Sequence, residues 1–195
     1  MEEKTSFKEL MLYYSVRFFG CLIRYLPIDI ALGIGRLLGA LAYYGDARRR
    51  QLVLLNLRTA FGREKSVGEL LAYTGQVFQN YGQNIIELLR MPLMTRQLFQ
   101  RYVRIEGQEH IREALKQGRG VILLAMHYGS WELANMISSV MEHPYKVIVK
   151  PQTRYSRLDK LLTSYRECGG GVTLQRGVGT RDLVRSLRRN EIVAL

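Results

Sequence analysis

The side chains best suited to chemistry in this 195-residue sequence are a histidine and a glutamate five positions apart, His127 and Glu132. A continuous helix would turn the two side chains onto different faces, because only residues three or four apart are neighbours there. The segment Tyr128-Gly-Ser favours a tight turn, and Ser130 is suited to cap a helix that starts at Trp131. We therefore expect His127 in a loop at the end of a strand, with Glu132 returning toward it from a helix.

A histidine oriented by a carboxylate can act as a general base and take the proton of a hydroxyl group. This is the least equipment needed to transfer an acyl group onto an alcohol, because the substrate hydroxyl then serves as the nucleophile. A structural role is the commoner interpretation of a lone histidine after a strand, and the spacing alone leaves it open. The apolar run at 121–126 favours the catalytic role, since open parallel sheets bind ligands beyond the carboxyl ends of their strands.

Short apolar segments alternate with amphipathic ones from about residue 100 onward. This alternation predicts an α/β fold with a largely parallel sheet flanked by helices. The expected strands are 102–105, 121–126 as the central strand, 145–149, 172–175 and 192–195. The expected helices are 108–117, 131–141, 154–167 and one capped by Thr180 that carries Arg181, Arg185 and Arg188 on one face.

The first 45 residues predict two amphipathic helices, 9–26 and 28–44, separated by Pro27. Charges interrupt both, so the sequence demands no transmembrane span, and the mixed charge of the first residues is unlike a signal peptide. A basic amphipathic helix with aromatic residues is typical of one lying in the membrane interface. The alternative is that both helices simply pack on the core.

The middle of the chain predicts further helices. Three arginines at 48–50 open one of them, and the capping-box pattern Ser66-Val-Gly-Glu69 starts a longer one that stops near Met91-Pro92. Gly35 and Gly39 have the spacing that allows close helix approach. We therefore expect membrane-associating helices at 1–45, a helical accessory region at 46–99 and an α/β catalytic core at 100–195. The apolar stripe expected to pack in the core from the longer helix is Leu70, Tyr73, Val77, Tyr81, Ile85 and Leu88.

The formal net charge of +12, from 29 Lys and Arg against 17 Asp and Glu, favours polyanionic partners such as nucleic acid, anionic lipid or an acidic carrier protein. The sequence has no helix-turn-helix, zinc or RNA-binding signature, so we expect no nucleic acid partner. Its two cysteines, Cys21 and Cys168, lie far apart without metal-ligand spacing. We expect no metal, no cofactor and a reducing, cytoplasmic setting.

An ordered set of motifs resembles the bacterial lipid A late acyltransferases, whose wider group includes the acyltransferases of mycobacterial phosphatidylinositol mannosides. The family carries His, four residues, then Asp or Glu, as in HYGSWE at 127–132. Where the family usually has Arg before Pro151, this chain has Lys150, which keeps the charge but loses the bidentate fork. The other similar segments, in the family's order, are RQLVLLNLRTAF at 50–61, NIIE at 84–87, VKP at 149–151, LD at 158–159 and RECG at 166–169.

The resemblance implies transfer of a fatty acyl chain from an acyl carrier protein thioester to a hydroxyl of a lipid A precursor, at the cytoplasmic face of the inner membrane. His127 would be the general base, and Glu132 would hold its tautomer and stabilise the imidazolium. Backbone N–H groups around Gly129 are candidates to stabilise the oxyanion. Candidates to bind the phosphates of a glycolipid acceptor or of a pantetheine arm are Lys150, Arg154 and Arg166, each of which has a surface role as its alternative.

Two alternatives stay open. The acceptor can be another anionic glycolipid of the phosphatidylinositol mannoside type, with acyl-CoA as the donor. Less expected is a basic nucleic-acid-binding module in which His127 is structural. Members of the family are usually longer, with an Asp-Gln and a Phe-Phe-Gly segment beyond the last strand expected here. We therefore interpret the chain as the amino-terminal part of the enzyme, with a catalytic core that is incomplete at its carboxyl end.

Overall fold

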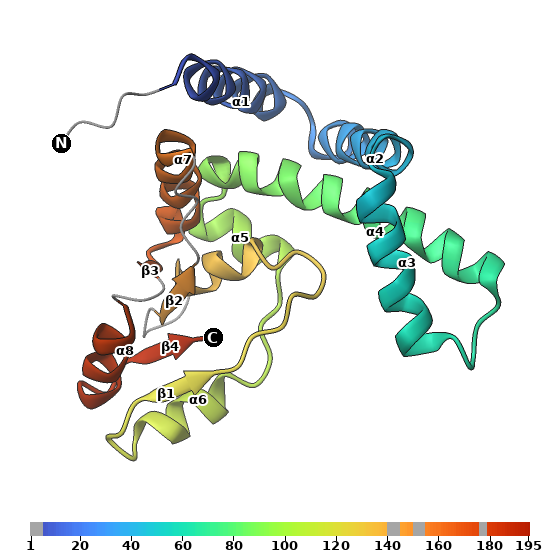
Figure 1. Ribbon diagram of the computed structural model, residues 1–195. Helices are drawn as coiled ribbons and strands as arrows, with labels where there is room; N and C mark the ends of the chain where they lie inside the picture. The colour runs from blue at the N-terminus through green and yellow to red at the C-terminus, as the bar shows by residue number, and fades with distance from the viewer. Residues whose placement is uncertain (1–5, 140–144, 150–154, 176–178) are drawn as a thin grey trace. The chain divides into compact units, whose positions relative to one another are not determined.

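The structure is a computed structural model that describes residues 6–139, 145–149, 155–175 and 179–195 (Figure 1). The chain divides into two compact units. One consists of Met1–Cys21 together with Leu88–Leu195, and the other is Leu22–Glu87. These units reflect internal packing alone, so the functional division at residues 45 and 99 stays a prediction.

Helices fill the amino-terminal half, as predicted. They are α1 (Phe7–Tyr25), α2 (Ile28–Gly45), α3 (Ala47–Phe61) and α4 (Val67–Arg90). Pro27 separates α1 from α2, since it has no N–H for a continuing helix. The predicted capping box at the start of α4 is confirmed, because the Ser66 N–H donates to the Glu69 carboxylate at 2.9 Å and the Glu69 N–H donates to Ser66 Oγ at 3.3 Å.

Within the unit Leu22–Glu87, α2 and α4 cross through glycines. A methyl group on Gly82 would lie 2.1 Å from the carbonyl oxygen of Gly35, and one on Gly39 would lie 2.2 Å from that of Phe78. Neither position has room for a side chain, so the two backbones touch directly. The predicted close approach at Gly35 and Gly39 is confirmed, and its partner is the backbone of α4 around Phe78 and Gly82.

The predicted core stripe of α4 is confirmed at Leu70 and Leu88, and it is wrong at Val77, Tyr81 and Ile85, which are exposed. Between its ends, the helix instead buries a stripe of positions three or four residues apart. Both faces of α4 are apolar, and only one of them carries a glycine where a second helix can come close. The buried stripe is Leu70, Thr74, Phe78, Gly82, Ile86 and Leu89.

The carboxyl-terminal half forms a four-stranded sheet in the order β1-β4-β2-β3, and every pairing in it is parallel. This confirms the predicted α/β class with a parallel sheet flanked by helices (Figure 1). The strands are β1 (Val121–Leu123), β2 (Tyr145–Val149), β3 (Val172–Gln175) and β4 (Ile192–Ala194). The helices are α5 (Arg96–Tyr102), α6 (Gln108–Leu115), α7 (Ser156–Arg166) and α8 (Gly179–Arg188), with 3-10 turns η1 (Met91–Leu93), η2 (Leu133–Ser139) and η3 (Glu167–Gly169).

Three predicted elements differ from the structure. The strand expected at 102–105 is the end of α5 followed by a loop, where Val103 is extended but pairs with no strand of the described sheet. The strand expected at the centre of the sheet is β1, which has three residues and lies at the edge of the described sheet. Its apolar run resembled a buried strand, yet Ile122 faces outward. The helix expected at 131–141 is a turn followed by the 3-10 helix η2, and the residues after 139 lie outside the described ranges.

The core of the sheet centres on β4, whose Ile192, Val193 and Ala194 are all buried. Ile192 and Ala194 pack with Tyr145 of β2 and Leu115 of α6. A second cluster in the same unit joins Met136 of η2 to Tyr165 of α7 and to Met91 of η1. Val121 and Leu123 of β1 pack against the first cluster and Leu133 of η2 packs against the second, so both ends of the loop that carries the predicted site are anchored in the core.

Candidate active site

His127 lies beyond the carboxyl end of β1. The Leu195 N–H donates to the Leu123 carbonyl at 3.0 Å, and the Ala125 N–H donates to the Leu195 carbonyl at 2.8 Å. These bonds continue the β1–β4 pairing as far as Ala125. His127 follows two residues later, at the end of a parallel sheet where ligands commonly bind.

A turn follows His127, as the sequence predicts. The Tyr128 N–H donates to the Met126 carbonyl at 2.9 Å, and Gly129 has a φ of +58°, which favours glycine. A methyl group on Gly129 would meet no atom within 4 Å. A glycine therefore suits this position because of its backbone conformation, and the space that a side chain would occupy is open.

The His127 side chain is exposed and lies against Trp131, with the ring centroids 5.6 Å apart and the ring planes at 43°. The sequence patterns indicate no functional role for Trp131. Its position four residues after His127 is a helical spacing, although the segment between them is a turn. The ring contact restricts the imidazole on the side of Trp131.

Glu132 is buried, and its carboxylate is held by an arginine from a distant part of the sequence. Arg166 Nε donates to Glu132 Oε2 at 2.8 Å, and Arg166 Nη2 donates to Glu132 Oε1 at 2.7 Å. The side chains are 10% and 22% exposed for Glu132 and Arg166. Two parallel bonds of this kind fix the orientation of a carboxylate.

Among the described residues, the interaction of His127 is the ring contact with Trp131, and the predicted dyad with Glu132 stays a prediction. Arg166 takes one hydrogen-bonding position on each carboxylate oxygen. A carboxylate has about four such positions, so these two bonds by themselves do not exclude an N–H from an imidazole. In the predicted dyad, the glutamate is thus buried and held by Arg166, and the histidine is exposed.

The predicted phosphate-binding residues have different outcomes. Lys150 and Arg154 lie outside the described residues. Arg166 is described, and its guanidinium is engaged with Glu132 rather than turned to solvent. No sequence pattern pairs positions 34 apart, so this contact was not visible before the fold brought the end of α7 beside η2.

No group of three or more His, Cys, Asp or Glu side chains gathers as a metal site within the described ranges. The expectation that the enzyme uses no metal stays a prediction.

Comparisons with known proteins bear on the whole chain. The family described as "Bacterial lipid A biosynthesis acyltransferase" matches residues 1–195. A phosphatidylinositol mannoside acyltransferase of Mycobacterium tuberculosis (strain CDC 1551 / Oshkosh) is 29% identical over 126 residues, which cover 60% of this chain and 39% of that protein. The lipid A biosynthesis lauroyltransferase of Escherichia coli (strain K12) is 26% identical over 172 residues, which cover 88% of this chain and 55% of that protein. The matched part of this chain thus spans about half or less of these relatives.

Proposed function

Because the chain belongs to the bacterial lipid A biosynthesis acyltransferase family, we propose that it transfers a fatty acyl chain from an acyl carrier protein thioester to a hydroxyl of a lipid A precursor. The observation that carries the proposal is the arrangement at the carboxyl end of β1. An exposed histidine follows the strand there, and five residues later comes a buried carboxylate that an arginine holds in place.

In the proposed reaction, His127 takes the proton from the acceptor hydroxyl as that oxygen attacks the thioester carbonyl. The new C–O bond forms, the C–S bond breaks, and the proton passes from His127 to the departing sulfur. Glu132 accepts the other N–H of the imidazole and stabilises the positive charge that develops on it. Backbone N–H groups near Gly129 stabilise the negative charge on the carbonyl oxygen.

Apolar side chains beside His127 support an acyl substrate. Leu124 and Met126 are each 81% exposed, and Tyr128 is 87% exposed. Exposed apolar groups that flank a polar reactive group are typical of sites that bind an amphipathic ligand. Lys150 and Arg154 are the proposed contacts for the phosphates of the acceptor or of the donor.

Attachment to the cytoplasmic face of the inner membrane belongs to the same proposal. The outward side of α1 carries large apolar side chains at intervals of three or four residues, and Lys8 and Arg17 near them are exposed. An apolar stripe with adjacent cations is typical of a helix lying in an anionic membrane surface. In the described part of the chain, α2 alone is long and apolar enough to cross a membrane, a test that soluble core helices and signal sequences also pass. The stripe of α1 is Phe7, Met11, Tyr14, Phe18, Leu22 and Tyr25.

A second acceptor class deserves the same test, because the mycobacterial relative is named for a phosphatidylinositol mannoside. In that case the donor is acyl-CoA and the acceptor is a mannosylated phosphoinositide. The two reactions share the histidine, the carboxylate and the hydroxyl nucleophile. They differ in the headgroup and in the carrier of the thioester.

The test compares membranes from cells expressing the chain, its His127→Ala variant and a matched His110→Ala variant. His110 is exposed on α6, so its loss controls for removal of an imidazole. Each preparation receives labelled acyl carrier protein thioester with a lipid A precursor, or labelled acyl-CoA with a phosphatidylinositol mannoside. We expect transfer by the parent and by His110→Ala, and a loss of about 10²–10⁴-fold in His127→Ala.

Equal transfer by the parent and His127→Ala, above membranes that lack the chain, would contradict the proposed base. Transfer restricted to the second donor and acceptor would replace the lipid A precursor with the mannosylated lipid. Recovery of the protein in the soluble fraction after mild lysis would contradict the membrane attachment.

A further inference from the structure

The outward face of α8 carries two arginines that have no acid partner in the described part of the chain. Arg181 and Arg188 are exposed and make no ion pair among the described residues. The neighbouring cations are occupied, since Arg185 donates to Asp182 at 2.8 Å and Arg189 lies 3.0 Å from Glu191. The unpaired charge of this helix is therefore concentrated at two positions.

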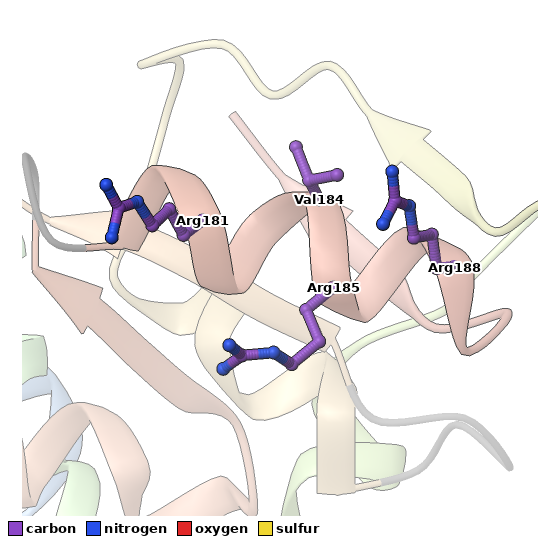
Figure 2. A pocket seen from close by; sticks show the side chains of 4 residues that line it. All are labelled: Arg181, Val184, Arg185 and Arg188. Atoms are coloured by element: carbon purple, nitrogen blue, oxygen red, sulfur yellow. The ribbon is translucent and has the colours of Figure 1, made fainter.

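The two positions form a row. Residues seven apart lie on the same side of a helix, about 10.5 Å apart along its axis. Figure 2 shows Val184 and Arg188 projecting to one side of α8, Arg185 projecting to the other, and Arg181 extending past the first turn of the helix. Val184 is 44% exposed, and a hollow of about 370 Å³ lies among the four side chains. We call Arg181, Val184 and Arg188 the arginine face.

The opposite side of α8 packs on the sheet. Ser186 is fully buried and accepts a hydrogen bond from Lys146 Nζ of β2 at 2.9 Å. The same lysine bonds Glu191, which follows α8. The arginine face is therefore turned away from the sheet by the packing of the helix and is not needed to hold the fold together.

One end of the arginine face lies toward the carboxyl ends of the strands, the end of the sheet at which His127 follows β1. Helix α8 connects the parallel strands β3 and β4, so it runs back along the sheet and begins at the carboxyl ends of the strands. Arg181 is in its first turn. A partner lying along the face would thus reach the carboxyl end of the sheet, where His127 follows β1.

We propose that the arginine face docks an acidic surface helix of the carrier protein that presents the acyl thioester; this rests on the proposed function. Two guanidinium groups two turns apart match carboxylates at the same spacing on a second helix, and each can bind a carboxylate with two bonds. The apolar contact of Val184 lies between them. Exposed charges of this kind steer encounter and fix orientation more than they add affinity.

A membrane is the less suitable occupant of this face. Binding in a membrane interface requires an extended apolar stripe, and the arginine face has one exposed valine and no aromatic side chain. The helix that does have such a stripe is α1. The two surfaces therefore suit different partners.

The test measures the dissociation constant of a fluorescent acyl carrier protein, loaded with a fatty acyl thioester, for the chain at low salt. The variant is the double charge reversal Arg181→Glu with Arg188→Glu. The matched control is Arg101→Glu with Lys160→Glu, which makes the same change in net charge at exposed positions on α5 and α7. We expect about tenfold weaker binding by the arginine-face variant and less than twofold by the control. We also expect the affinity of the arginine-face variant to depend less on salt.

Equal weakening by both double variants would overturn the proposal, because net charge alone would then explain the binding. So would loss of binding to vesicles of anionic phospholipid, with carrier binding unchanged, in the arginine-face variant. The milder double variant Arg181→Gln with Arg188→Gln, checked by circular dichroism, separates docking from misfolding. Binding requires no turnover, so carrier binding that needs the arginines in a chain without transferase activity would leave the docking surface in place and separate it from the proposed function.

Discussion

The crossing of α2 and α4 and the sheet edge that carries His127 differ in what holds their backbone. At the crossing, the backbones of Gly35 and Gly82 touch, and a single added methyl group has no room. At the sheet edge, Gly129 has open space beside it, and the fixed point is the charged pair of Glu132 with Arg166. At the crossing, the helices come close because glycines have no side chains. At the sheet edge, the side chains of Glu132 and Arg166 bond to each other and hold the backbone.

This difference separates a structural contact from a site that must admit a ligand. Closely packed helices are stabilised because their atoms fill the space between them without voids or overlaps. A site for a lipid substrate needs unfilled volume next to groups whose orientation is fixed. The crossing should therefore be sensitive to added atoms, and the sheet edge to removed ones.

The largest effect we expect is from removing atoms at the sheet edge. Arg166→Ala deletes both bonds to the Glu132 carboxylate and should destabilise the protein by about 3 kcal/mol, as loss of one partner of a buried ion pair does. The measurement is the free energy of unfolding from a urea titration. The double variant Arg166→Met with Glu132→Leu should be close to the parent in stability while lacking transferase activity. A parent-like stability of Arg166→Ala would show that the pair does not hold this edge.

A smaller effect is expected from adding atoms at the crossing. Gly82→Ala should destabilise the protein by about 1–3 kcal/mol, because the new methyl group overlaps the Gly35 carbonyl oxygen. Gly75→Ala on the same helix is the control, since its methyl group would meet nothing within 4 Å and should stabilise α4 by about 0.5–1 kcal/mol. Thermal unfolding followed by circular dichroism measures both. Equal shifts in melting temperature would contradict a close crossing.

The smallest effect concerns a charged pair outside both regions, Lys146 with Glu191. The hydrogen bond from Lys146 holds the pKa of the Glu191 carboxyl below its ordinary value. A lowered pKa means that the ionised carboxylate stabilises the fold above the pKa of the unfolded chain, and this stabilisation is lost as pH falls through the folded pKa. Glu191→Gln should therefore cost about 1 kcal/mol at pH 7 and progressively less in acid, below the ordinary range of a glutamate. A cost that stays constant from pH 7 into acid would assign the effect to shape rather than charge.

Local patterns predicted much of the fold. The capping box of Ser66 with Glu69, the break at Pro27 and the strands 145–149 and 172–175 depend on neighbours in the sequence, and the structure has them. The family was also recognisable from the order of short motifs, and the match over residues 1–195 confirms it. Other predictions depended on which apolar surface packs against another element, and these were wrong. They are the middle of the α4 stripe and the central position of β1 in the sheet.

The candidate site divides in the same way. The turn after His127 could be predicted from the sequence, because a glycine in this segment favours left-handed backbone, and the alternating elements predicted the parallel α/β class. The burial of Glu132 against Arg166 and the place of β1 at the sheet edge became visible only in the folded chain. The difference is the distance along the sequence over which each feature is set. Turns and caps are fixed by hydrogen bonds between near neighbours, whereas the partner of a buried charge is whichever residue the packing of distant elements brings within bonding distance.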